Sequence, residues 1–229
     1  MTTPPVIAPD PFAAYPAPVR WLLERAAPDE DAIALLDPRH SLDALYSAWT
    51  AQSLFPSALR LIVGVLPSRE SVWWAWVSAR YVTQAEGGTP ATADVHKTLS
   101  AIEQWIVRPE DDARRAAWDA GTAAGMDTPV GMIAAAVFLS GTSVAPANMA
   151  PVPPPPGVAM PLVAGAILLS AASVQQPEQI VPTMSAFAAQ GLEIIKRLGG
   201  WDPALQLAYD THQRLQHEYT RATAPASAR

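Results

Sequence analysis

Apolar residues recur every three to four positions along most of this chain, which is the spacing that places them on one face of a helix. Near the N-terminus, Val19, Leu22, Leu23 and Ala26 form such a face, and charged residues between them such as Arg25 are expected outside. No stretch alternates apolar and polar residues over the length of a strand with turn residues at both ends. The pattern predicts an all-α fold, a single bundle of about nine to eleven helices.

Proline, glycine and capping residues divide this pattern into separate helices. Proline suits the first turn of a helix and breaks a helix interior, and glycine often follows the last turn. Ser41 is a predicted cap, and both Thr89–Pro90 and Thr128–Pro129 have the form of a cap followed by a first-turn proline. Helices are predicted over residues 18–27, 29–36, 42–54, 58–66, 67–82, 90–108, 110–124, 129–140, 158–174, 176–198 and 202–221, with a kink at Pro182.

The segment at residues 66–82, LPSRESVWWAWVSARYV, is the one around which the rest is predicted to pack. It holds three of the chain's eight tryptophans, and one buried aromatic side chain removes about 150–250 Å² from water. At about 100° per residue, its apolar side chains lie all round the helix. The segment is therefore predicted to be a central helix that neighbours cover on several sides.

Proline is unusually frequent, with 24 residues against 12 glycines. The run Pro153, Pro154, Pro155 and Pro156 predicts an extended polyproline II segment that crosses one end of the bundle. Residues 1–14 are predicted to be a proline-rich strap or tail, residues 15–222 one helical domain, and residues 223–229 a flexible tail.

Charge and composition exclude several classes of function. The net charge of −6 and the absence of any cluster among 15 Lys and Arg argue against a nucleic-acid partner. The lack of cysteine excludes disulfides, thiolate catalysis and cysteine-based zinc sites. The N-terminus lacks the pattern of a secretory signal, and the apolar runs are shorter than the roughly 20 residues of a transmembrane helix. We expect a cytoplasmic protein with no transmembrane segment, while its oligomeric state stays open.

Three motifs follow one another within residues 60–195: LPSRESVWWAWVSAR, AAAVFLSGTSVAPANMAPVPPPP and VAGAILLSAA. In this order they resemble an uncharacterised bacterial all-helical family, the DUF6931 type. Genes of this type often lie near those of type VI secretion and related contractile systems. The resemblance therefore implies an accessory role in such an apparatus.

Arg69, Trp73, Trp76 and Arg80 follow steps of four, three and four, which places them on one strip of the central helix. A guanidinium beside an indole gains about 0.5–2 kcal/mol and can still hold a carboxylate or phosphate. One interpretation is an anion-binding or partner-binding groove. The other is an internal arginine that pairs with a carboxylate of the same domain.

The proline run is the second candidate, with Pro151 and Pro154 at PxxP spacing. Exposed proline runs dock on aromatic grooves of partner proteins. In the alternative, Met149 and Val152 pin the run to the domain's own tryptophans as an internal strap.

No catalytic, metal or cofactor site is predicted. His212 and His217 are five residues apart, about 140° out of phase on a helix, and Ser140 does not lie in a GxSxG motif.

The leading hypothesis is a non-catalytic adaptor, accessory or chaperone-like component of a type VI secretion system that binds a protein partner. The alternatives are a small-ligand-binding protein or enzyme with an anion pocket beside Trp73, Trp76 and Arg80, and peripheral membrane attachment through the alanine-rich helices.

Overall fold

The computed structural model describes residues 10–84 and 91–224. These residues form eleven α-helices and one 3-10 turn, and none of them lies in a strand, so the predicted all-α fold is confirmed. The helices are α1 (Ala17–Ala26), α2 (Glu30–Ile33), α3 (Leu42–Ala51), α4 (Phe55–Val65), α5 (Ser68–Gln84), α6 (Ala93–Val107), α7 (Asp111–Ala124), α8 (Pro129–Leu139), α9 (Met160–Ala172), α10 (Ile180–Arg197) and α11 (Trp201–Thr223).

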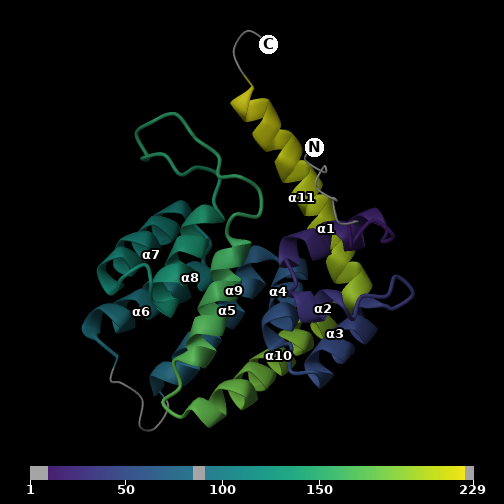
Figure 1. The fold of residues 1–229 in the computed structure, drawn as a ribbon. Coiled ribbons are helices and arrows are strands. Elements are labelled where there is room, and N and C mark those ends of the chain that lie inside the picture. Colours follow the sequence, from purple (N-terminus) through teal and green to yellow (C-terminus); the bar gives the residue numbers. More distant parts are fainter. Residues whose placement is uncertain (1–9, 85–90, 225–229) are drawn as a thin grey trace, which may run out of the picture.

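The helices gather in two groups around a shared centre (Figure 1). On one side α6 packs on α7 and α7 packs on α8. On the other side α1, α3, α10 and α11 surround α4. Between the groups, α9 contacts α4, α5, α8 and α10, and α5 contacts α6, α8, α9 and α10. None of the helices in residues 10–84 and 91–224 is both long enough and apolar enough to span a membrane.

Buried tryptophans lock neighbouring elements together. Trp49 and Trp74 are completely buried, and an indole N–H that leaves water needs a new acceptor. Trp49 Nε1 donates to the carbonyl of Ala32 at 2.9 Å, and Trp74 Nε1 donates to that of Phe187 at 3.2 Å. These bonds tie α3 to α2 and α5 to α10, so the tryptophans set the register of helices as well as filling the core.

Local signals fix most of the helix starts. Ser41 Oγ accepts from the Ala44 N–H at 3.1 Å, and Thr128 Oγ1 accepts from the Gly131 N–H at 3.1 Å, as the caps predict. The predicted start at Thr89–Pro90 lies outside the described residues. Helix α6 instead begins at Ala93, where Thr92 is the cap.

The predicted kink at Pro182 is wrong. The 3-10 turn η1 (Pro177–Gln179) precedes α10, and Pro182 lies in the first turn of α10. A first-turn backbone nitrogen has no carbonyl partner in its own helix, so a proline there breaks no hydrogen bond.

Helix α5 contacts α6, α8, α9 and α10 but is not covered all round. Trp74 and Ala75 are fully buried, whereas 40% of Trp73 and 57% of Tyr81 is exposed. Four helices contact α5, and the part of its surface that carries these two aromatic residues stays open.

Candidate binding groove

A cavity of about 540 Å³ opens between α11 and the loop that joins α8 to α9. Residues of two segments line its sides, and Figure 1 shows the backbone of both, the green loop above α8 and α9 and the yellow C-terminal half of α11. We call these two sides the proline wall and the α11 wall. We call this cavity the groove, and residues 151–156 of the loop the proline segment. The floor comes from α1, from the end of α4 and from the first residues of α5 and α9.

The α11 wall presents an apolar stripe. Trp201, Ala204 and Leu205 are buried at the base of α11, and beyond them no residue of α11 is buried in the described part of the chain. Figure 1 shows the C-terminal half extending past the other helices. Leu207 and Leu215 line the groove and remain 52% and 40% exposed. Exposed apolar side chains that form one surface are typical of a contact site.

The proline wall forms the opposite side. Pro151 and the four prolines of the run all line the groove. At the base of the loop, Ser143 Oγ accepts hydrogen bonds from the N–H groups of Ala145 and Val152, at 3.1 and 3.0 Å. The N–H of Val144 also donates to the carbonyl of Val152 at 2.8 Å. These bonds close the loop on itself just before the proline run begins.

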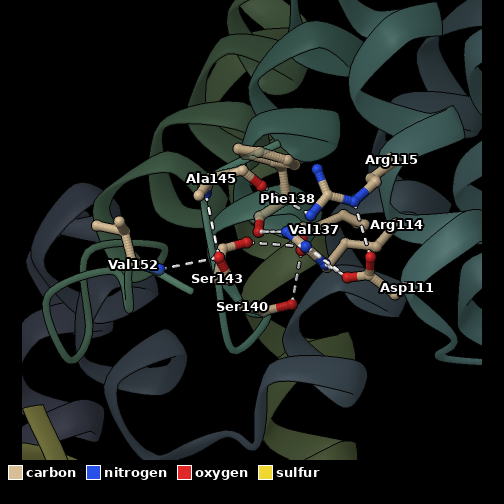
Figure 2. Close-up of polar contacts among 9 residues, drawn as sticks. All are labelled: Asp111, Arg114, Arg115, Val137, Phe138, Ser140, Ser143, Ala145 and Val152. Atoms are coloured by element: carbon tan, nitrogen blue, oxygen red, sulfur yellow. Dashed lines mark hydrogen bonds and ion pairs between the residues drawn. The ribbon is translucent and has the colours of Figure 1, made fainter. Parts of the chain in front are cut away.

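A buried arginine holds this loop to the body (Figure 2). Only 3% of the Arg114 side chain is exposed. Its guanidinium donates to the carbonyls of Phe138, at 2.5 Å, and Ser143, at 2.8 Å, and it lies 4.7 Å from the centre of the Phe138 ring. A side chain at position 141 would overlap Arg114, so the loop can pass this close to Arg114 only with a glycine there. Arg114 thus fixes both ends of the turn that leaves α8.

Asp111 supplies the opposite charge. Its carboxylate accepts from Arg114 Nε at 2.9 Å and from Arg115 Nε at 2.7 Å. Hydrogen bonds from Arg115 and Arg114 lower the pKa of Asp111. Arg115 reaches on to the carbonyl of Ala145, at 2.9 Å. A buried guanidinium is tolerated when its charge is paired and its N–H groups are bonded, as here.

Two residues of α1 complete the floor. The Trp21 ring lies 5.6 Å from the Tyr209 ring and 5.3 Å from the His212 ring, so it attaches α1 to α11. Arg25 stacks over Trp21, with 5.5 Å to the ring centre, and its Nη2 donates to the carbonyl of Pro156 at 3.2 Å. Burial lowers the pKa of Arg25, and burial together with the charge of Arg25 lowers that of His212. Helix α1 therefore contacts both walls of the groove.

The model of a family of unknown function, DUF6931, matches residues 45–195, which is more than half of the chain. The chain belongs to the DUF6931 family. The match confirms the resemblance carried by the three motifs. No curated protein and no solved structure matches the chain. The region matched to DUF6931 contains the proline segment and its arginine anchor, whereas α1 and α11 lie outside it.

The tryptophan and arginine strip of this DUF6931 member does not line the groove. Trp73 is exposed, but Trp76 is buried, with its Nε1 donating to the Leu99 carbonyl at 2.9 Å. Arg80 stacks over Trp76, 4.7 Å from the ring centre, and Arg69 Nε donates to the Ile106 carbonyl at 2.6 Å.

Among the described residues, neither Arg69 nor Arg80 forms an ion pair with a carboxylate. Helical steps bring the four residues of the strip to one side of α5, but packing against α6 covers part of that side. The strip is therefore divided into an exposed part at Trp73 and a buried part at Trp76.

The proline candidates do line a cavity, but not in the way the internal strap predicts. Met149 and Val152 remain 63% and 52% exposed, so they do not pin the run to the tryptophan core. Pro153, Pro154 and Pro156 are partly buried, and Pro155 is exposed. The run is fixed through the backbone, by Arg25 at its end and by the loop anchors at its start.

Sequence reasoning missed the floor and the α11 stripe. Arg25 was expected outside, yet it is partly buried below the proline segment. The signal that could have found it is the four-residue step from Trp21, which places an indole and a guanidinium on one helix face. The four-residue steps from Leu207 to Thr211, Leu215 and Tyr219 are the corresponding signal for α11.

The groove contains hydroxyl, imidazole and carboxylate groups, from Ser71, His212 and Glu218 among others. Ser71 Oγ donates to the Ser68 carbonyl at 3.0 Å, and His212 lies against Trp21. In the part of the chain that the structure describes, no three His, Asp or Glu side chains come close enough together to hold a metal ion. The arrangement offers apolar contact and the guanidinium groups of Arg25 and Arg221, which suits binding.

Proposed function

We propose that this DUF6931 member is a cytoplasmic, non-catalytic adaptor that binds an amphipathic helix of a partner protein in the groove. The observation that carries the proposal is the pair of exposed leucines, Leu207 and Leu215, on the groove side of a helix that extends past the body. The family resemblance implies that this partner belongs to a bacterial contractile secretion system.

The shape of the groove favours an elongated partner. From Leu207 to Tyr219 the stripe spans twelve residue steps, which is about 18 Å of helix. The proline segment runs along the other wall without regular hydrogen bonding of its own. An amphipathic helix that presents apolar residues at three- to four-residue steps would contact both walls at once.

Site-specific photo-crosslinking in the native host tests this proposal. A photoreactive benzoylphenylalanine replaces Leu215 in one strain and Gln213 in the other. Both positions are exposed and lie about 160° apart on α11, and only Leu215 lines the groove. We expect the Leu215 position, and not the Gln213 position, to capture a component of the secretion apparatus through an amphipathic helix.

Two outcomes of the crosslinking experiment would contradict the proposal or part of it. Capture of the same protein at both positions, or at neither, would contradict binding in the groove. Capture at the Leu215 position of a protein unrelated to secretion would keep the groove and reject the secretion role.

A small-ligand-binding protein is the second candidate, because a 540 Å³ cavity lies within the range of about 300–1,000 Å³ usual for ligand sites. Native mass spectrometry of protein purified from its own host tests it. A bound metabolite of constant mass that Leu215→Gln releases would favour the second candidate over the adaptor.

A further inference from the structure

Arg25 carries a positive charge that no carboxylate of the described residues neutralises. Its side chain is partly buried, stacks on Trp21 and donates one hydrogen bond, from Nη2 to the Pro156 carbonyl at 3.2 Å. No ion pair to Arg25 exists within the described chain. Charged groups that leave water are usually paired, and a lone guanidinium keeps N–H groups free to bind an anion.

The other arginine of the same helix shows the contrast. Arg20 lies on the outside of α1, where its guanidinium pairs with Asp10 at 2.9 Å and with Glu24 at 2.8 Å. The acidic residues near α1 thus neutralise the exposed arginine and leave the partly buried one without a carboxylate. Within the described residues, Arg25 is therefore left without a counter-ion.

A glycine at the end of the proline segment leaves the space in which the Arg25 guanidinium lies. Gly157 has a φ of +80°, which favours glycine, and a side chain there would overlap the Arg25 guanidinium. Arg25 therefore occupies the space that a larger residue at position 157 would fill. The guanidinium is held at the floor of the groove, below the proline segment.

The surroundings of Arg25 define the rest of the ligand. Val63, Leu66, Val72 and Met160 line the same cavity and offer no charge. Glu218 also lines it, but its carboxylate approaches Arg214, at 3.9 Å, and it lies six residues beyond His212 on α11. The α11 wall also carries polar side chains, among them His212, and a second arginine, Arg221. An anion at Arg25 would thus have apolar neighbours on the floor and a mixed apolar and polar wall on α11.

We infer that Arg25 is an anion-binding subsite of the groove, and that the groove takes a carboxylate carried on an apolar body. A free aliphatic carboxylate has this chemistry, and so does an Asp or Glu side chain on the apolar face of a partner helix. The inference deepens the proposed function by defining the charge of what enters the groove, and it rests on the groove being the binding site.

Isothermal titration calorimetry with three ten-carbon probes tests the subsite without any partner. The probes are decanoate, decanol and decyltrimethylammonium, which share an apolar chain and differ in charge. We expect decanoate to bind about tenfold tighter than the other two, the size of a hydrogen-bonded charge interaction of about 1.4 kcal/mol. Equal binding of all three probes would overturn the inference.

Two variants of α1 supply the matched comparison. Arg25→Gln removes the proposed subsite, and Arg20→Gln removes the same charge from the outer face of the same helix. We expect Arg25→Gln to bind decanoate no more tightly than decanol, and Arg20→Gln to keep the wild-type preference. Retention of the preference by Arg25→Gln would show that another group binds the anion.

Chemical protection of the wild-type chain gives an answer even if Arg25→Gln does not fold. Phenylglyoxal modifies accessible guanidinium groups, and peptide mass spectrometry locates the modified arginines. Decanoate should slow modification of Arg25 at least about fivefold and leave Arg20 unchanged, whereas equal protection of both would contradict the subsite.

The probe experiment tests the anion subsite and the crosslinking experiment tests the adaptor role, so either proposal can be rejected without the other. A decanoate preference without capture at position 215 would keep the anion subsite and reject the adaptor. Capture without any decanoate preference would keep the adaptor and reject the subsite. If capture at position 215 is lost when decanoate is added, the partner and the free carboxylate use the same site.

Discussion

The two walls of the groove are held by different kinds of interaction. The proline wall is fixed by hydrogen bonds from charged groups, from Arg114 and Arg115 at the start of its loop and from Arg25 at the end of the run. The α11 wall is fixed by apolar packing of Trp201, Ala204 and Leu205 at the base of the helix, and by the ring contacts of Trp21 farther along.

The position of the proline wall is therefore set by its anchors, whereas the α11 wall is supported mostly by its own helix. A proline run has no regular hydrogen bonds of its own, so anchors at its ends must set its position. A helix satisfies its backbone internally, so α11 can extend past the body although none of its described residues beyond Leu205 is buried. Mutations should therefore affect the two walls through different residues.

The largest expected effect is at the base of the α11 wall. Trp201 is buried to 8% exposure, and its ring lies 5.8 Å from that of Tyr46. We expect Trp201→Ala to lower the free energy of unfolding by about 3–5 kcal/mol through lost burial and the cavity left behind. Chemical denaturation measures it, and a loss below about 1 kcal/mol would show that α11 is not held there.

The second effect concerns the anchor of the proline wall. Arg114→Met removes the bonds to the Phe138 and Ser143 carbonyls but keeps a long apolar side chain. We expect it to lower the free energy of unfolding by about 2–3 kcal/mol, because both carbonyls lose a charged donor. Hydrogen exchange should become faster in residues 143–156 than in α11. Equal acceleration in both walls would contradict separate anchoring.

A smaller effect is expected at Gly157. Alanine there must adopt a positive φ and must displace the Arg25 guanidinium. We expect Gly157→Ala to cost about 1–2 kcal/mol of unfolding free energy. The double variant Gly157→Ala with Arg25→Gln should recover part of that cost, because the overlap is gone while the backbone strain remains. A double-mutant cycle measures the coupling, and strict additivity would contradict it.

The smallest expected effect is the pH dependence caused by His212. Burial and the positive charge of Arg25 lower its pKa in the folded chain below the ordinary value of 6.5. The unfolded chain then binds a proton more readily, so this contribution is present above about pH 6.5 and declines as the pH falls. Wild type should lose more stability than His212→Gln between pH 7.5 and 5.5. Parallel pH profiles for the two proteins would contradict the assignment.

The helices could largely be predicted from the sequence because their signals are local. Ser41 and Thr128 cap helices within three residues, and Gly125, with a φ of +96°, ends α7 where glycine was expected. The exposure of Trp73 could not be predicted, because apolar residues all round a helix do not say which side its neighbours leave open. That depends on how α6 and α10 pack against α5.

The groove could be predicted only in part, because its anchors connect distant residues. The proline run is visible in the sequence, but Arg25 meets Pro156 across 131 positions. Arg114 follows a run of acidic residues typical of a helix start, and its burial depends on carbonyls that lie 24 and 29 residues further along. Helical periodicity alone placed Arg25 outside and gave no signal that Arg114 is buried.

The affinity of the partner captured at position 215 tests the central claim most directly. The claim is that the α11 stripe and the proline wall bind one helix together. Leu215→Gln should weaken the complex about tenfold or more, about 1.4 kcal/mol, while Gln213→Ala on the opposite face leaves the affinity unchanged. Equal affinity of Leu215→Gln and wild type would contradict the account.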